Sequence, residues 1–147
     1  MLADAAAAET CSLVATADRV SELDEWIERT GASWRVPEDV VFRARVCVAE
    51  IAANLIEHGR ACPEGDEMTV VLRPDGTGLE IELTDTGRAF DSTVPPEPAS
   101  ANGPGGRGLR LFHAYAAAMS YRRDAGRNIL RVRVLPAQPG ARGGSPS

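Results

Sequence analysis

The chain has 147 residues and a formal net charge of −5, with 44% hydrophobic and 25% charged residues. This length and composition are typical of one globular domain, and the acidic balance argues against direct binding to nucleic acid or to an anionic membrane. All 16 basic residues are arginine, which excludes lysine-dependent chemistry such as a Schiff base or a Walker-type phosphate loop.

The cysteines and the N-terminus bear on the compartment. Cys11, Cys47 and Cys62 are odd in number and widely spaced, so they predict neither a disulfide framework nor a CxxC metal pair. The first ten residues contain no basic side chain, and no apolar run approaches the roughly 18 residues of a membrane-spanning helix. We therefore expect a cytoplasmic protein with neither a signal peptide nor a membrane segment.

The first elements expected along the chain are a strand and a helix. After a flexible N-terminus at residues 1–10, the sequence CSLVATA at 11–17 predicts a short strand. The sequence DRVSELDEWIERTG at 18–31 has apolar residues at helical spacing, and Gly31 is placed to end the helix.

A second helix is expected from near Pro37 to about His58, with Gly59 as its stop. Glu50, Asn54 and His58 recur in it at four-residue steps. At about 100° per residue they lie on the edge of the apolar stripe, where a helix packed on a sheet can direct side chains into a cleft. On this helix alone, a solvated flank remains the alternative, with His58 interacting with the last carbonyls of the helix.

Two hairpins, a long loop and a third helix are expected in the second half of the chain. MTVVLRP at 68–74 and LEIELTD at 79–85 predict the first hairpin, joined by a Gly-containing turn. Residues 92–107 hold four prolines and three glycines and predict a loop. The periodicity of residues 109–119 predicts a helix, and residues 120–136 a second hairpin.

This order of elements predicts an α+β fold of two layers, with helices on one face of a mostly antiparallel mixed sheet. We expect one domain at residues 11–135. The Pro/Gly/Ser-rich residues 136–147 predict a disordered tail.

Two glycine-containing segments could bind a ligand. In TDTGRAFD, Asp85 closes a predicted strand and Gly87 lets the backbone turn closely, although the segment taken alone is also typical of a simple turn. A carboxylate oriented in this way can accept a hydrogen bond from an exocyclic amine. Several glycines lie immediately before a helix start, where backbone N–H groups can converge on a phosphate: Gly103, Gly105, Gly106 and Gly108.

The helix motif with Glu50 and Asn54, the Asp85–Gly87 segment and the glycine-rich segment are more specific in this order than each is alone. VAEIAANLIEHG, DTGRAFD and GGRGLRLFHAYAAAMSYRRDAGRNIL resemble the anti-sigma-factor serine kinases of bacterial partner-switching systems, a branch of the GHKL superfamily of histidine kinase-like ATPases. The resemblance covers roughly residues 10–135. It implies a Bergerat-type ATP-binding fold, ATP and Mg²⁺ as cofactors, and a homodimer.

The resemblance implies a role for several residues. Glu50 matches the general base toward a serine hydroxyl, and Asn54 matches the magnesium ligand. Asp85 matches the residue that receives the adenine amino group, and Gly87 the glycine that leaves room for the base. Asn128 falls where the family places a hydroxyl or amide residue near this aspartate.

The remaining matches lie in the second glycine box, whose backbone donors meet the phosphates: Gly105, Gly106, Gly108 and Leu109. One position departs from the family pattern, because Ala89 stands where the first box often has its second glycine. The resemblance also includes a histidine at the position of His58, for which we expect a structural role. For Cys47 we expect a small buried thiol rather than a redox switch.

The function implied is that of an ATP-dependent protein serine/threonine kinase. It would phosphorylate a STAS-domain anti-anti-sigma partner and alternately sequester a sigma factor. A first alternative is a nucleotide-dependent anti-sigma binding module without kinase activity. A second is the detached catalytic domain of a sensor histidine kinase, which would need a phosphoacceptor histidine from another polypeptide, because His58 and His113 both lie inside the expected nucleotide fold.

Overall fold

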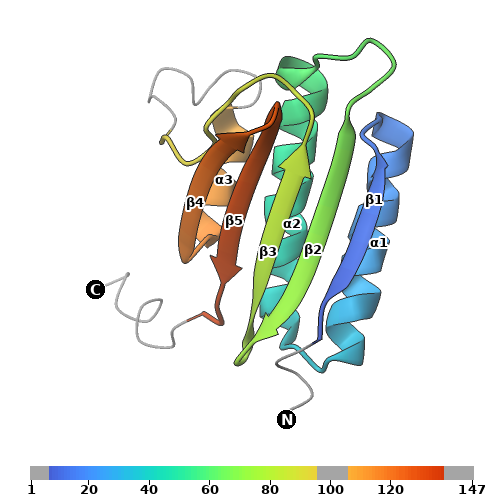
Figure 1. Cartoon of the computed structure of the whole chain (residues 1–147). Coiled ribbons are helices and arrows are strands. Elements are labelled where there is room, and N and C mark those ends of the chain that lie inside the picture. Colours follow the sequence, from blue (N-terminus) through green and yellow to red (C-terminus); the bar gives the residue numbers. More distant parts are fainter. Residues whose placement is uncertain (1–6, 96–105, 138–147) are drawn as a thin grey trace.

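The computed structural model describes residues 7–95 and 106–137. These form five strands, three α-helices and one π-helical turn, arranged in two layers (Figure 1). In chain order they are β1 (Glu9–Val14), α1 (Ala17–Ser33), α2 (Glu38–Asn54), the π turn η2 (Leu55–Gly59), β2 (Glu67–Asp75), β3 (Gly78–Asp85), α3 (Gly106–Tyr115), β4 (Ala118–Asp124) and β5 (Arg127–Val134).

The strands form one sheet in the order β1-β2-β3-β5-β4, and every neighbouring pair is antiparallel. The three helices cover one face of this sheet, as Figure 1 shows, and none of the described helices lies on the other face. The predicted two-layer α+β fold is therefore confirmed. The described strands include no parallel pair, so the sheet is antiparallel throughout rather than mixed.

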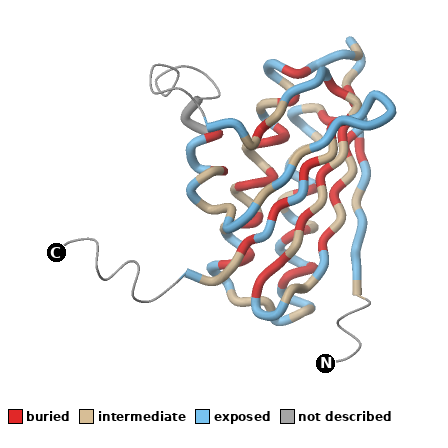
Figure 2. Tube along the Cα trace, turned by 60° about the vertical axis from the view of Figure 1, so that its left-hand side comes forward, coloured by how far each residue is buried: buried red, intermediate tan, exposed pale blue. Residues whose placement is uncertain are grey.

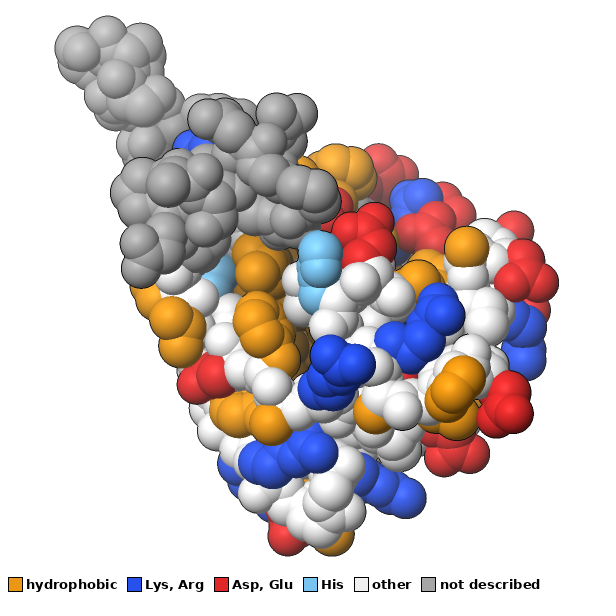
Figure 3. Space-filling model, turned by 90° about the horizontal axis from the view of Figure 1, so that it is seen from above, with side chains coloured by type: hydrophobic (Ala, Val, Ile, Leu, Met, Phe, Trp, Pro, Cys, Tyr) orange, Lys and Arg blue, Asp and Glu red, His pale blue; other side chains and the backbone are white. Residues whose placement is uncertain are grey.

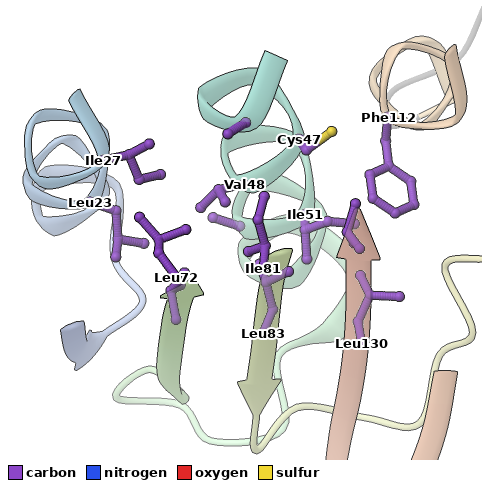
Figure 4. Close-up of a cluster of buried hydrophobic side chains, with 14 of the residues drawn as sticks. Leu23, Ile27, Cys47, Val48, Ile51, Leu72, Ile81, Leu83, Phe112 and Leu130 are labelled. Atoms are coloured by element: carbon purple, nitrogen blue, oxygen red, sulfur yellow. The ribbon is translucent and has the colours of Figure 1, made fainter. Parts of the chain in front are cut away.

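The core lies between the two layers, and α2 runs through its middle. Its buried side chains, such as Val48 and Ile51, face Ile81 and Leu83 of β3, while α1 and α3 close the core on either side (Figure 4). Buried and more exposed residues alternate along the central strands (Figure 2). This alternation is expected of a sheet that packs on one face only.

Gly31 does not end the first helix as predicted, because α1 continues to Ser33. The residue is buried, and a Cβ atom built on it would lie 2.6 Å from Cγ2 of Val41 in α2. Gly31 is therefore a packing residue where the two helices touch. The chain leaves the helix only after Ser33, through Arg35, whose backbone φ is 59°.

The ends of three further elements differ from the prediction. β1 takes in Glu9 and Thr10 of the expected flexible N-terminus, because their backbones pair with β2. The third helix begins at Gly106 and ends at Tyr115, and the chain from Ala118 onward pairs with β5 instead of continuing the helix. The second helix changes to a π turn after Asn54.

The predicted flexible N-terminus and disordered tail otherwise fall mainly on residues 1–6 and 138–147, which lie outside the described residues. In the parts that the structure covers, no helix has both the length and the apolar character needed to cross a bilayer.

Candidate active site

The candidate site lies where β3 ends and β5 begins, beside the end of α2. The antiparallel register places Asp85, the last residue of β3, directly opposite Asn128 of β5. Asn54 is the last residue of α2, and its side chain lines the same cavity as these two residues. Three polar residues predicted from separate motifs are thus brought together at one end of the sheet.

The carboxylate of Asp85 is held on one side only. Its Oδ1 atom accepts a hydrogen bond of 2.8 Å from the backbone N–H of Gly87 and another of 2.8 Å from the side-chain amide of Asn128. Oδ2 has no hydrogen-bond partner among the residues that the structure describes. No side-chain oxygen in this part of the chain is both fully buried and unpaired, so the unpaired Oδ2 must keep some exposed surface. Oδ2 is therefore free to accept a hydrogen bond from a ligand in the cavity.

Burial changes the acidity of this carboxyl group. Asp85 is 8% exposed, and burial raises the pKa of its carboxyl group above the ordinary value, because the charged form loses its water. The hydrogen bonds from Asn128 and Gly87 act in the opposite direction, because they favour the charged form.

Asn128 is the centre of the hydrogen-bond network. It is 6% exposed, and its amide nitrogen donates to Asp85 Oδ1 and to the carbonyl oxygen of Arg88, both at 2.8 Å. Its amide oxygen accepts from the hydroxyl of Tyr121 at 2.6 Å, from Arg123 at 3.0 Å and from the backbone N–H of Phe90 at 3.2 Å. One amide thus holds both the carboxylate and the loop after it.

The cavity has an apolar floor and a polar wall. Its enclosed part has a volume of about 30 Å³, which has room for about two water molecules, and the cavity opens to solvent. The lining residues are Ile51, Asn54, Leu55, Gly59, Leu83, Asp85, Arg88, Phe90, Ser92, Tyr121, Asn128 and Leu130.

Two of these lining residues, Arg88 and Phe90, are exposed, and exposed side chains change rotamer readily. The end-on view in Figure 3 shows arginine, acidic and hydrophobic side chains mixed on this surface.

Gly87 is required by close packing inside the protein. A Cβ atom built on it would lie 2.7 Å from the carbonyl oxygen of Gly59 and would also clash with Cδ1 of Leu55. The same Gly59 oxygen accepts the backbone N–H of Arg88 at 2.8 Å. The turn after Asp85 therefore packs directly on the π turn that follows Asn54, which brings the two motifs into contact.

Glu50 lies one turn before Asn54 in α2 and is half-buried. It does not line the cavity, and its side chain makes no hydrogen bond or ion pair to any other described residue. His58 does not line the cavity either; its side chain is 48% exposed and lies 3.5 Å from the carboxylate of Glu57.

The predicted phosphate-binding glycines are only partly visible. Gly105 lies outside the described residues, while Gly106 and Gly108 form the first turn of α3. The first N–H groups of a helix have no partner within it, so this placement agrees with a role as backbone donors, which stays a prediction. Leu109 is buried in the core.

Several polar residues of this site were not predicted. Tyr121 and Arg123 of β4 point to Asn128 because the register pairs them with Leu130 and Asn128. That register follows from the two-residue turn Ala125–Gly126, in which both residues have positive φ (53° and 77°), the conformation of a type I′ hairpin. The sequence DAGR indicates such a turn. The positions of Tyr121 and Arg123 beside Asn128 follow from it only when the pairing register of the two strands is also assumed.

Cys47 is fully buried in the core, as expected. Burial raises the pKa of its thiol to about 12, which keeps it protonated and unreactive at neutral pH.

Comparison with known proteins gives three results. Residues 13–134 match the family described as the histidine kinase-like ATPase domain. The serine/threonine-protein kinase BtrW of Bordetella bronchiseptica is 27% identical over 129 residues, which cover 84% of this chain and 91% of that protein. The histidine kinase domain of the Erythrobacter litoralis EL346 blue-light activated histidine kinase is 20% identical, with a TM-score of 0.44 over 67% of this chain and 45% of that one. The family match spans most of the chain, and the chain therefore belongs to the histidine kinase-like ATPase domain family.

Proposed function

We propose that this ATPase domain is a protein serine kinase that transfers phosphate from Mg-ATP to a STAS-type anti-anti-sigma partner, and that it alternately binds a sigma factor. The observation that carries the proposal is the carboxylate of Asp85, which is fixed at Oδ1 and open at Oδ2 toward a cavity shared with Asn54. The similarity to a protein named as a serine/threonine kinase supports the reaction type.

The residues of the cavity suit adenine. The exocyclic amine of adenine is a hydrogen-bond donor, and Asp85 Oδ2 is an acceptor beside an apolar floor of Ile51, Leu83 and Leu130. The enclosed part of the cavity is smaller than the base, so we propose that Phe90 and Arg88 move outward when nucleotide binds.

The magnesium ion would be held mainly by the nucleotide. The described residues contain no group of three or more His, Cys, Asp and Glu side chains that could hold a metal ion. Mg²⁺ commonly keeps several waters and takes one or two protein ligands together with phosphate oxygens. Asn54 fits this role, because its amide oxygen is a hard ligand at the edge of the cavity.

Glu50 is the proposed general base. ATP supplies the phosphoryl group, and the carboxylate of Glu50 accepts the proton of the attacking serine hydroxyl. Its half-buried position on α2, one turn before Asn54, places it beside the cavity rather than in it. This agrees with a base that meets the partner's serine and not the nucleotide.

The second candidate is an anti-sigma module that binds nucleotide without transferring phosphate. One observation favours it: no hydrogen bond or ion pair to a described residue holds the carboxylate of Glu50 in a fixed orientation, as a general base would need. The two candidates differ at this residue, because Glu50→Gln keeps the size of the side chain and removes the base. Only the kinase loses an activity in that variant, whereas nucleotide binding survives in both cases.

The proposal is tested in two steps. Calorimetric titration with Mg-ATP should show binding to the wild-type chain and its loss in Asp85→Asn. The wild-type chain is then used to capture proteins from the native cytoplasm with and without ATP, and the captured proteins are incubated with Mg-ATP and analysed for phosphoserine. Phosphorylation of a STAS protein by the wild type and not by Glu50→Gln supports the kinase. ATP binding without phosphorylation of a captured STAS protein refutes the kinase activity.

A further inference from the structure

A second buried carboxylate, Asp66, has no role in the function proposed above. It immediately precedes β2 and is 3% exposed. It forms no ion pair with any arginine or histidine among the described residues. A buried carboxylate without a cation is costly unless several donors satisfy it.

The donors around Asp66 come from two separate segments. Oδ2 accepts the backbone N–H groups of Ala61 at 2.9 Å and Cys62 at 3.5 Å, in the segment just after the π turn. Oδ1 accepts the hydroxyl of Thr86 at 3.1 Å, and this hydroxyl in turn accepts the backbone N–H of Glu67 at 3.1 Å. We call Asp66 and Thr86, with these hydrogen bonds, the Asp66–Thr86 bracket.

The bracket joins the two halves of the site. Thr86 stands between Asp85 and Gly87, and Ala61 follows the π turn that continues the helix of Asn54. A further hydrogen bond, from the backbone N–H of Arg88 to the carbonyl oxygen of Gly59 at 2.8 Å, joins the same two segments. The residues on both sides of Gly87 are thus tied to the end of α2.

An acidic side chain suits this arrangement. Two backbone N–H groups and one hydroxyl all need an acceptor at the same place, and a carboxylate is the acceptor-only side chain with enough lone pairs. The negative charge also has a cost at the site, because Asp66 adds to the rise in the pKa of Asp85. An uncharged side chain that only filled the space of Asp66 would not raise the pKa of Asp85 in this way.

Resting on the proposed function, we propose that Asp66 and Thr86 are positioning residues that aim Asp85 Oδ2 at the exocyclic amine of the bound purine. Neither residue lines the cavity, so neither touches the base. Loosening the bracket should therefore weaken one interaction, the hydrogen bond between Asp85 and the amine, and leave the contacts to ribose and phosphates unchanged.

The test compares two nucleotides in calorimetric titrations: Mg-ATP, and Mg-purine riboside triphosphate, which lacks only the exocyclic amine. The wild type should bind Mg-ATP more tightly than this analogue. Thr86→Val removes the hydroxyl at nearly the same shape, and we expect it to reduce the preference for ATP about fivefold to tenfold, the value of one hydrogen bond. Thr86→Ser restores the hydroxyl and should restore the preference. Asp66→Asn provides a second variant, with the same expected loss, should Thr86→Val fail to fold.

The outcomes separate the two proposals. A loss of stability alone, with the preference for ATP unchanged in folded Thr86→Val and Asp66→Asn, means that the bracket is only structural and overturns the inference. Equal binding of the two nucleotides by the wild type overturns it as well, because Asp85 then does not read the amine. If the wild type binds neither nucleotide, the proposed function falls and the inference with it.

Discussion

Asn128 Nδ2 donates a hydrogen bond of 2.8 Å to Asp85 Oδ1, and both residues are more than nine-tenths buried. This bond decides which oxygen of the carboxylate is left for a ligand. Because the same amide also holds the carbonyl oxygen of Arg88, the orientation of the carboxylate and the path of the loop are set by one side chain. A buried network of this kind is stable only while every member keeps its partners.

Replacing Asn128 should therefore destabilise the protein strongly. Asn128→Ala leaves Asp85 Oδ1 with one donor fewer and deprives Tyr121 and Phe90 of their acceptor. We expect the free energy of unfolding to fall by about 2–3 kcal/mol, the usual cost of buried groups left unpaired. Urea unfolding followed by circular dichroism measures it. Arg127→Ala, at the exposed neighbouring position, serves as the control and should change stability by less than about 0.5 kcal/mol.

The charge of Asp85 should make the ligand-free protein less stable as pH rises. Burial raises the pKa of this carboxyl group in the folded state, so the folded protein binds its proton more tightly than the unfolded chain. The stabilisation is fully present below the unfolded pKa, near 3.9, and is lost as pH rises through the folded pKa. Between those pH values the contribution of Asp85 to stability falls.

Asp85→Asn tests this, because its amide oxygen can still accept from Gly87 and Asn128. The variant should show a higher free energy of unfolding than the wild type at pH 7, and the difference should shrink as pH falls toward 4. Urea unfolding of both proteins across this range supplies the comparison. A wild type that is more stable than the variant at pH 7 would contradict the argument. The same variant should lose ATP binding, which is the trade-off between stability and function that active sites often show.

The parts of the fold that follow from periodicity were predictable. The apolar stripe of α2 and the alternation of Leu79, Ile81 and Leu83 in β3 each predict a buried face, and the structure buries these residues. The order of elements then leaves few ways to cover one side of an antiparallel sheet. The edge position of Asn54 was predictable for the same reason, since a helical wheel gives angles relative to the buried stripe.

The contacts between motifs were not predictable. The π turn after Asn54 has no local signal, and its effect, the contact of Gly87 with Gly59, depends on how α2 lies on the sheet. Asp66 precedes a strand like many acidic residues that are solvated, and only the tertiary fold buries it. Gly31 was misread for a similar reason, because a glycine that ends a helix and one that lets two helices touch look alike in sequence.

Cys47 should not react with thiol reagents in the folded protein. Burial raises its pKa to about 12, so the thiolate that reacts with iodoacetamide is nearly absent at pH 8, and the side chain is inaccessible. Peptide mass spectrometry after labelling should find Cys47 modified only when urea is present. Cys62, which is partly exposed, is the internal control and should be labelled in the native protein. Rapid labelling of Cys47 without urea would show that the core opens near α2.

Gly87→Ala should damage both stability and nucleotide binding. The new methyl group would meet the side chain of Leu55, which can move, and the carbonyl oxygen of Gly59 at 2.7 Å, which cannot move without disturbing the π turn. We expect a loss of about 1–3 kcal/mol in the free energy of unfolding, the usual cost of overpacking, together with weaker binding of Mg-ATP, because the turn moves away from α2 and takes Asp85 with it. Unfolding and calorimetric titration measure the two effects.

Gly76→Ala is the matched control for this substitution. No atom lies within 4 Å of a Cβ built on Gly76, and its φ of 63° makes the variant strained in the backbone alone. It should cost about 1 kcal/mol and leave the affinity for Mg-ATP unchanged, because the turn between β2 and β3 lies at the opposite end of these strands from Asp85 (Figure 1). If Gly87→Ala behaves like Gly76→Ala in both measurements, the packing of the Asp85 turn on the end of α2 does not control the site.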